Sequence, residues 1–156
     1  MLVNDFEKFY NKALRFLSYR PRSEKEIVDK LLSKKASENI VKEVIKKLKE
    51  YRFVDDLEFA NAWVRSRIKT KPRAWRVIKS ELKQKGISDE IIGQIYNSEL
   101  AIDELKMAKE LVKKKISKYK NLPRQEVYQK LGRFLASKGF NWDTIKGSID
   151  EVFKKG

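Results

Sequence analysis

The clearest structural signal in the sequence is the stretch at residues 23–32, Ser23-Glu24-Lys25-Glu26-Ile27-Val28-Asp29-Lys30-Leu31-Leu32. The hydroxyl of Ser23 can accept a free backbone N–H of a first helical turn, and Glu26 can reach back to the N–H of Ser23. The four apolar residues that follow are spaced i, i+1, i+4 and i+5, so they form one stripe on a helix. The stretch therefore predicts an amphipathic helix that begins at Ser23.

Similar helices are expected on both sides of this stretch. Ser37 and Asp55 each precede a further apolar stripe, Gly86 ends another helix, and Ser88 starts the next one. Only 6 Gly and 3 Pro interrupt the chain, and no segment alternates as a strand would. We predict an all-α fold. The apolar positions assigned to these helices are Ile40, Val41, Val44, Ile45, Leu48, Phe59, Ala60, Trp63, Val64, Ile68, Ile78, Leu82, Ile91, Ile92, Ile95 and Tyr96.

The helical pattern repeats along the chain, first after 51 residues and then after a further 53. The equivalent positions are Pro21-Arg22, Ile27 and Leu31 in the first copy, Pro72-Arg73, Trp75, Ile78, Leu82 and Lys85-Gly86 in the second, and Tyr128, Leu131, Leu135 and Lys138-Gly139 in the third. Such a period is typical of a helical repeat array. We predict three three-helix, helix-turn-helix-like repeats at residues 1–51, 52–98 and 99–156, forming one elongated array that is able to curve.

The composition excludes several classes of function. With no Cys among 156 residues there is no disulfide, no thiolate nucleophile and no Cys-ligated metal. With no His, the usual general base and the commonest metal ligand are absent. We therefore expect no cofactor and no metal. Neither a signal peptide nor an 18-residue apolar run is visible, so we expect a cytoplasmic protein without a membrane partner.

The charge points to a polyanionic partner, because 37 Lys and Arg against 22 Asp and Glu give a net charge of +15. Nine basic residues against the single acid Glu81 stand between residues 65 and 85, and they form our candidate site for nucleic acid. A solvated helix face is the alternative. A second stretch rich in basic residues lies at 113–133, and for its Lys113–Lys115 cluster the two interpretations are about equally favoured. The nine candidate residues are Arg65, Arg67, Lys69, Lys71, Arg73, Arg76, Lys79, Lys83 and Lys85.

Two further features have a functional and a structural interpretation. Trp75 stands in the basic cluster and could stack on a base, but its repeat partner Tyr128 favours a place in the core. Asp55, Asp56 and Glu58 could hold magnesium for phosphoryl chemistry. Acids in a first helical turn are also favoured as caps, and no phosphate-binding loop accompanies them. We therefore interpret them as caps and expect no catalytic activity.

Several motifs in one order and spacing give the chain a resemblance to the RecX family, bacterial regulators of the RecA recombinase. They cover residues 13–96 strongly, with Ala74 as a departure, since Gly is expected after the Pro-Arg pair. The matching motifs are Arg20-Pro21-Arg22-Ser23-Glu24-Lys25-Glu26 with Leu31-Leu32, Phe53-Val54-Asp55-Asp56 with Phe59-Ala60, Trp63-Val64-Arg65 with Arg67, Lys71-Pro72-Arg73, and Leu82-Lys83-Gln84-Lys85-Gly86-Ile87.

The resemblance implies a cytoplasmic, non-enzymatic inhibitor that binds RecA filaments on single-stranded DNA, in the helical groove of the filament. It implies reduced ATP hydrolysis, coprotease activity and strand exchange by RecA, and hence a limit on DNA recombination, DNA repair and the SOS response. We expect a monomer whose partners are RecA and single-stranded DNA, with double-stranded DNA a further partner. The alternative is a stand-alone basic helical DNA-binding protein that acts without RecA.

Overall fold

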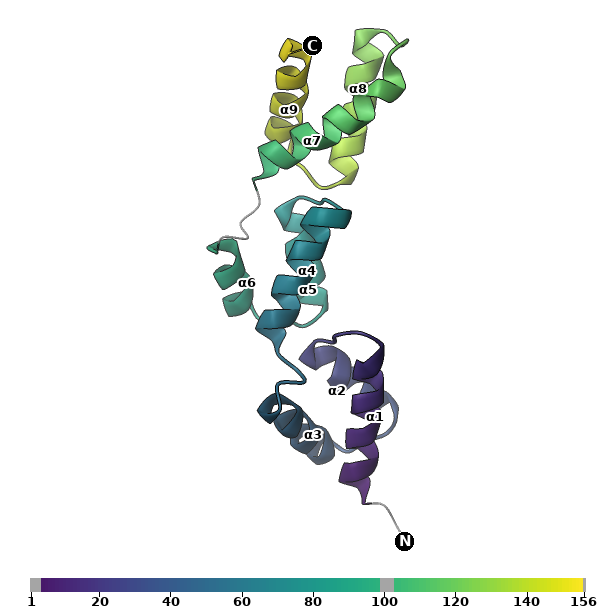
Figure 1. The fold of residues 1–156 in the computed structure, drawn as a ribbon, viewed down its shortest axis with the longest axis vertical. Coiled ribbons are helices and arrows are strands. Elements are labelled where there is room, and N and C mark those ends of the chain that lie inside the picture. The colour runs from purple at the N-terminus through teal and green to yellow at the C-terminus, as the bar shows by residue number, and fades with distance from the viewer. Residues whose placement is uncertain (1–3, 99–102, 156) are drawn as a thin grey trace. The chain divides into compact units, whose positions relative to one another are not determined.

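The structure, a computed structural model, describes residues 4–98 and 103–155, and in this part of the chain helices are joined by short connections (Figure 1). It contains nine α-helices, one 3-10 turn and no strand, which confirms the predicted all-α fold for the described residues. No helix in this part has both the length and the apolar composition needed to cross a membrane. The helices are α1 (Asp5–Tyr19), α2 (Glu24–Ser33), α3 (Glu38–Glu50), α4 (Asp56–Thr70), α5 (Trp75–Gln84), α6 (Asp89–Tyr96), α7 (Glu104–Ile116), η1 (Ser117–Tyr119), α8 (Arg124–Ser137) and α9 (Trp142–Lys155).

The helix starts follow the capping signals in the sequence. The Ser23 hydroxyl accepts the Glu26 N–H at 3.3 Å, and Glu26 Oε1 accepts the Ser23 N–H at 3.2 Å, so the predicted capping box is present. Ser37 and Ser88 each accept the N–H three residues later, at 3.2 Å in both cases. These bonds satisfy backbone donors that have no partner inside the helix.

The chain forms two compact units, which we name by their place in the sequence. The N-terminal unit comprises residues 1–63 and 81–95, and the C-terminal unit comprises residues 64–80 and 96–156. The division runs through α4 and α5, so both helices contribute residues to both units.

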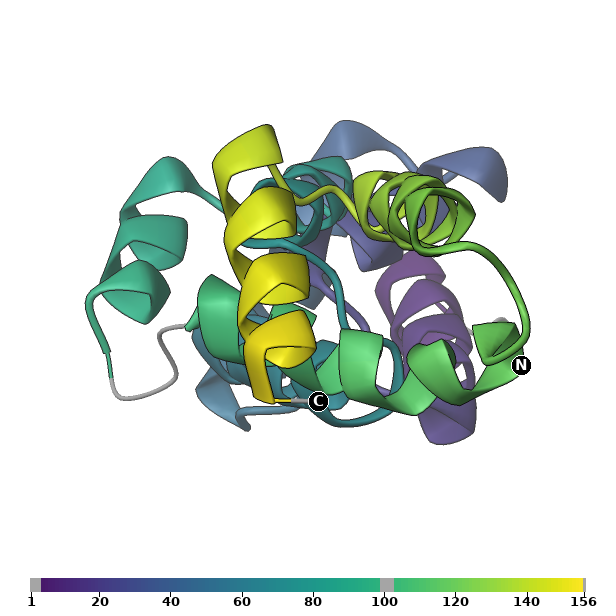
Figure 2. The same cartoon turned by 90° about the horizontal axis from the view of Figure 1, so that it is seen from above.

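In the N-terminal unit, α1, α2 and α3 pack against one another and enclose an apolar core (Figure 1). The core of the C-terminal unit lies where α7 packs along α9 and α8 contacts both; Figure 2 shows α9 in yellow against the green α7. Burial of this apolar surface is the main source of stability for such units. Core side chains with no exposed surface include Ala13, Ile27, Leu31, Val44, Leu48, Ala108, Val112, Leu131, Leu135 and Ile149.

The repeat predicted from the sequence is visible in the burial pattern. Ile27, Ile78 and Leu131, one from each copy, are all fully buried. The same holds for Leu31, Leu82 and Leu135, one helical turn further along. Equivalent positions in α2, α5 and α8 therefore have the same structural role, as a tandem helical repeat requires.

The three helices α2, α5 and α8 also end in the same turn. Ala36, Ile87 and Phe140 donate their N–H groups to the carbonyls five residues earlier, at 3.1, 3.0 and 3.3 Å. The residue before each donor has a left-handed conformation, with φ of 70° at Lys35, 79° at Gly86 and 94° at Gly139. This is the Schellman arrangement, which usually contains glycine.

The difference between Lys35 and the two glycines follows from what packs against each turn. A Cβ atom on Gly86 would overlap Lys25 at the start of α2, and one on Gly139 would overlap Val77 in α5. We name these two contacts the first junction, in the N-terminal unit, and the second junction, in the C-terminal unit. At the second junction, the N–H of the fully buried Ala74 donates to Lys138 O at 3.0 Å. The departure from Gly at position 74 is therefore accommodated without a left-handed conformation.

Candidate nucleic-acid interface

The nine predicted site residues are divided between the two compact units. Lys83 and Lys85 belong to the N-terminal unit, and the other seven belong to the C-terminal unit. We call these seven the basic run. It comprises Arg65, Arg67 and Lys69 on α4, Lys71 and Arg73 on the connection to α5, and Arg76 and Lys79 on α5.

Five members of the basic run are exposed to solvent, namely Arg65, Lys69, Lys71, Arg76 and Lys79. Arg67 is half-buried and makes contacts within the structure. These exposed cations lie on two helices and the connection between them, so they can contact successive phosphates of a flexible strand. Each such contact releases counterions from the phosphate, and this release favours binding. The basic run thus has the chemistry of a phosphate-binding surface.

Two arginines of the basic run make contacts at the second junction. Arg76 Nε donates to the carbonyl of Gly139 at 2.7 Å and so holds the turn after α8. Arg73 is half-buried, and its Nη1 donates to the carbonyl of Pro72 at 2.9 Å. Both guanidinium groups have further donors, because each carries five N–H bonds.

The two predicted lysines in the N-terminal unit lie next to acids. Lys83 Nζ is 3.5 Å from Asp89 Oδ1, and Lys85 Nζ is 3.7 Å from Glu26 Oε2. Lys85 also lies over the ring of Trp63, with Nζ 5.5 Å from the ring centroid. Both lysines therefore have an acidic neighbour, whereas the described residues provide no ion-pair partner for the exposed members of the basic run.

Two cations at the second junction were not among the predicted site residues, Lys115 at the end of α7 and Lys138 after α8. Their Nζ atoms lie 4.3 and 5.3 Å from the centroid of the Phe134 ring. Burial, followed by the charges of Arg73 and Lys115, lowers the pKa of Lys138. In the repeat, Lys138 is equivalent to Lys85, which was a predicted site residue. This equivalence is the sequence signal that could have identified Lys138 as a site residue.

Trp75 is half-buried, and its ring packs against Tyr96 with centroids 5.4 Å apart. Its backbone N–H donates to Glu104 Oε1 at 2.7 Å, so an acid from the start of α7 caps α5. The ring thus has an intramolecular partner, which agrees with the favoured structural interpretation, and stacking on a base stays the less favoured alternative.

The acidic cluster at the start of α4 is engaged in capping. Asp55 Oδ1 accepts the N–H of Glu58 at 3.1 Å, and Asp56 Oδ1 accepts the N–H of Glu24 at 2.8 Å. Burial raises the pKa of Asp56, aided by the charges of Glu24 and Asp55 and opposed by the Glu24 N–H bond and by Lys49. No group of three acidic side chains in the described residues is arranged to hold a metal ion.

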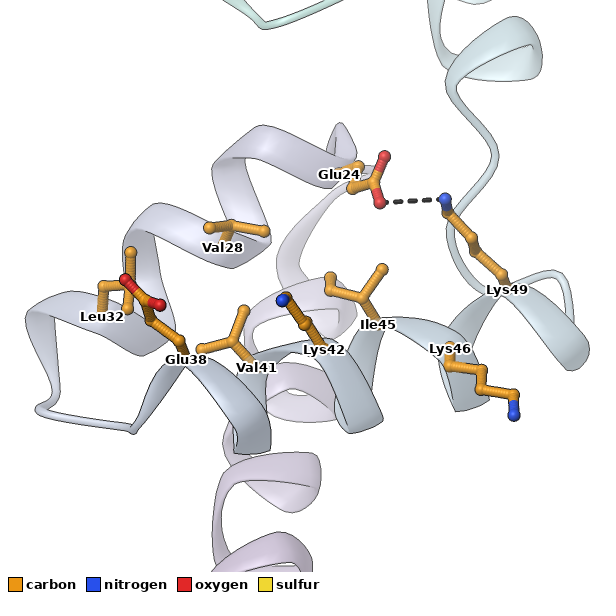
Figure 3. A pocket seen from close by; sticks show the side chains of 9 residues that line it. All are labelled: Glu24, Val28, Leu32, Glu38, Val41, Lys42, Ile45, Lys46 and Lys49. Carbon is orange, nitrogen blue, oxygen red and sulfur yellow. Dashed lines mark ion pairs between the residues drawn. The ribbon is translucent and has the colours of Figure 1, made fainter.

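An apolar groove of about 560 Å³ lies between α2 and α3 (Figure 3). Val28 and Leu32 line it from α2, and Val41 and Ile45 line it from α3. At one end, Lys49 Nζ forms an ion pair with Glu24 Oε1 at 2.9 Å, drawn as a dashed line in Figure 3. The groove contains none of the nine predicted residues.

Comparison with known proteins places all three helical repeats in one family. Models of the first, second and third three-helix domains of RecX match residues 10–48, 55–94 and 102–147. A crystal structure of RecX from Lactobacillus salivarius superposes with a TM-score of 0.79 and 32% identity, covering 97% of this chain and 98% of that chain.

The sequences of curated relatives agree with these matches. The chain is 35% identical to "Regulatory protein RecX" of Clostridium tetani, covering 96% of this chain and 69% of that protein. It is 37% identical to the protein of the same name from Bacillus subtilis, covering 96% and 56%. It thus spans little more than half the length of the Bacillus relatives it matches. With three domain models and full-length structural similarity in agreement, the chain belongs to the RecX family.

Proposed function

We propose that this protein is a non-enzymatic regulator of the RecA recombinase. It binds RecA filaments on single-stranded DNA and reduces their ATP hydrolysis, strand exchange and coprotease activity. In the cell this activity limits recombination, DNA repair and the SOS response, and it takes place in the cytoplasm. The protein acts as a monomer and needs no cofactor.

Membership of the RecX family across all three helical domains is the observation that carries this proposal. The exposed residues of the basic run add a surface for DNA phosphates within a filament, and the net charge of +15 favours association with any polyanion. We further propose that the domains are divided as residues 1–51, 52–98 and 99–156. Each junction then joins one domain to the next.

DNA-dependent ATP hydrolysis by RecA on single-stranded DNA tests the proposal. We expect inhibition at amounts of this protein well below those that saturate the DNA, because a filament regulator acts on RecA rather than on free phosphates. The control is an unrelated basic protein of matched net charge. Inhibition that begins only near DNA saturation, and that the control equals, would contradict regulation of RecA.

The alternative function is DNA binding without RecA, which the exposed basic run alone would also support. Titration of labelled single-stranded and duplex DNA, with and without RecA, separates the two functions. A regulator of filaments binds the RecA-coated strand more tightly than the bare strand at the same salt concentration. Equal affinity for both would favour the stand-alone DNA-binding protein.

A further inference from the structure

The two junctions are built alike, and at the first one a carboxylate gathers three cations. Glu26 Oε2 lies 2.5 Å from Arg20 Nη2, 3.7 Å from Arg22 Nη1 and 3.7 Å from Lys85 Nζ. The Glu26 side chain is only 14% exposed. The positive charges at this junction are therefore partly compensated from within the chain.

The second junction has the equivalent cations but lacks the carboxylate. The repeat offsets place Lys71, Arg73, Val77 and Lys138 at the positions of Arg20, Arg22, Glu26 and Lys85. Val77 contacts Gly139 instead of accepting hydrogen bonds, since a Cβ at Gly139 would overlap its methyl group. The carboxylate that partly compensates the cations of the first junction is thus replaced by an apolar side chain.

The cations of the second junction nevertheless gather in one place. Lys115 and Lys138 share the ring of Phe134. Arg73 directly precedes Ala74, whose N–H donates to the carbonyl of Lys138 at 3.0 Å. Within the described residues, none of these three cations forms an ion pair with a carboxylate. Burial and the charges of its two neighbours lower the pKa of Lys138, as expected where like charges meet without a counterion.

We propose that the second junction binds a phosphate group from outside the chain, with Arg73, Lys115 and Lys138 as its ligands. The bound group is a phosphodiester of a DNA strand that follows the basic run. The identity of the ligand as DNA rests on the proposed function, whereas the existence of an anion site at the junction does not.

Phosphate is favoured over a carboxylate of a protein partner for two reasons. Three converging cations match the charge and the several acceptor oxygens of a phosphate, and an arginine can bind two of these oxygens at once. The exposed Lys71, in the same unit and next in sequence to the Pro-Arg pair, extends the site toward the rest of the basic run. A continuous strand can therefore occupy the junction and the basic run together.

The first test uses inorganic phosphate and thermal unfolding of the intact chain. We expect phosphate to raise the melting temperature in a saturable way, beyond sodium chloride at equal ionic strength, because it binds only the folded junction. Val77→Glu restores the internal carboxylate and should weaken the response, while Val77→Gln, of similar size but uncharged, should retain it. Equal responses of the two variants, or of phosphate and chloride, would overturn the proposal.

Two further measurements complete the phosphate test. If Val77→Glu does not fold, Lys138→Gln and Arg73→Gln take its place, and each should weaken the phosphate response. The same unfolding measurement with acetate in place of phosphate tests a carboxylate as the alternative ligand. If acetate stabilises the protein as much as phosphate does, the junction is selective for carboxylates and the phosphodiester assignment is wrong.

The second test measures binding of a labelled oligothymidylate by fluorescence anisotropy across a range of salt concentrations, without RecA. Loss of one phosphate contact in Lys138→Gln should reduce the slope of log affinity against log salt by about 0.7. Lys146→Gln, an exposed lysine on α9, is the control and should leave the slope unchanged. Equal slopes for the two variants would contradict a phosphate contact at the junction.

These measurements are independent of RecA, so the two proposals can fail separately. A normal phosphate and oligothymidylate response without inhibition of RecA would leave the site in place and overturn the proposed function. If the protein inhibits RecA specifically but shows no phosphate response, only the proposed phosphate site at the second junction is overturned.

Discussion

At the scale of single residues, Glu26 links the start of α2 to the charges of the first junction. Burial alone would raise its pKa, but the Arg20 hydrogen bond, the Ser23 N–H and the charge of Lys85 outweigh burial and hold the pKa below its ordinary value. Since the folded pKa is lower than the unfolded one, the ionised carboxylate stabilises the fold above the unfolded pKa. This stability is lost as the pH falls through the folded pKa.

We therefore expect Glu26→Gln to reduce the free energy of unfolding by about 1–3 kcal/mol at neutral pH, as for a lost hydrogen bond to a charged group. Glutamine keeps an oxygen that can accept the Ser23 N–H, so the change in the free energy of unfolding reports the contribution of the Glu26 charge. Urea unfolding of both proteins from neutral pH to about pH 3 measures it. The difference between them should shrink toward acid, and a constant difference would show that the charge of Glu26 contributes nothing.

Residues that act over a short stretch of chain were predictable, and those that act across the repeat were not. The capping box of Ser23 and Glu26 is complete within four residues, so its sequence pattern is sufficient. The role of Asp56 as a cap was expected at its own helix, yet it accepts the N–H of Glu24, at the start of α2. Arg76 was assigned to DNA, and its partner Gly139 lies 63 residues away. No local sequence pattern encodes a contact between residues that lie so far apart in the chain.

At the scale of elements, the turn after α8 depends on glycine for two separate reasons. Gly139 has a φ of 94°, and its Cα lies against Val77 of α5. Gly139→Ala would introduce both backbone strain and an overlap with Val77, so we expect it to lower the free energy of unfolding by about 2–4 kcal/mol. Urea denaturation monitored by far-ultraviolet circular dichroism measures this loss.

Gly93 provides the matched control for this change. It lies inside α6, where a Cβ atom would meet nothing within 4 Å. Gly93→Ala should therefore raise the free energy of unfolding by about 0.5–1 kcal/mol, because alanine costs less chain entropy in a helix. In the double variant Gly139→Ala with Val77→Ala, part of the lost stability should return. Equal effects of alanine at 93 and 139 would show that the junction does not constrain the turn.

The repeat made most elements predictable, because its apolar stripe recurs at Ile27, Ile78 and Leu131. The contacts between copies were less accessible to sequence reasoning. Lys35 and Gly86 end equivalent helices with the same left-handed turn, and only the packing of α2 against Gly86 explains why the residues differ. Sequence reasoning thus found the repeating unit but not how one copy contacts the next.

At the scale of the whole molecule, the excess of positive charge divides into groups with different surroundings. Lys83 and Lys85 lie beside acids, the cations of the second junction form no ion pair within the described residues, and the basic run contributes exposed side chains. A net charge of +15 gives general attraction to polyanions. A specific DNA-binding surface requires, in addition, that certain cations contribute more to DNA affinity than others do. The relevant comparison is therefore between variants of equal charge.

The triple variant Arg65→Gln, Lys69→Gln and Lys79→Gln removes three exposed charges of the basic run. We expect the slope of log affinity for single-stranded DNA against log salt to fall by about 2, since each lost phosphate contact contributes about 0.7. Inhibition of RecA's ATP hydrolysis should also require several times more protein. Salt-dependent anisotropy and the ATP hydrolysis assay provide the two measurements.

The matched control removes the same amount of charge from the second basic stretch at residues 113–133, through glutamine at the exposed Lys114, Lys118 and Lys120. If the basic run is the specific surface, the control should keep nearly the slope and the inhibition of the parent protein. Equal losses in both triple variants would mean that binding follows net charge alone. A greater loss in the control would instead place the DNA-binding surface in residues 113–133, which contain the Lys113–Lys115 cluster for which the sequence favoured a nucleic-acid surface and a solvated face about equally.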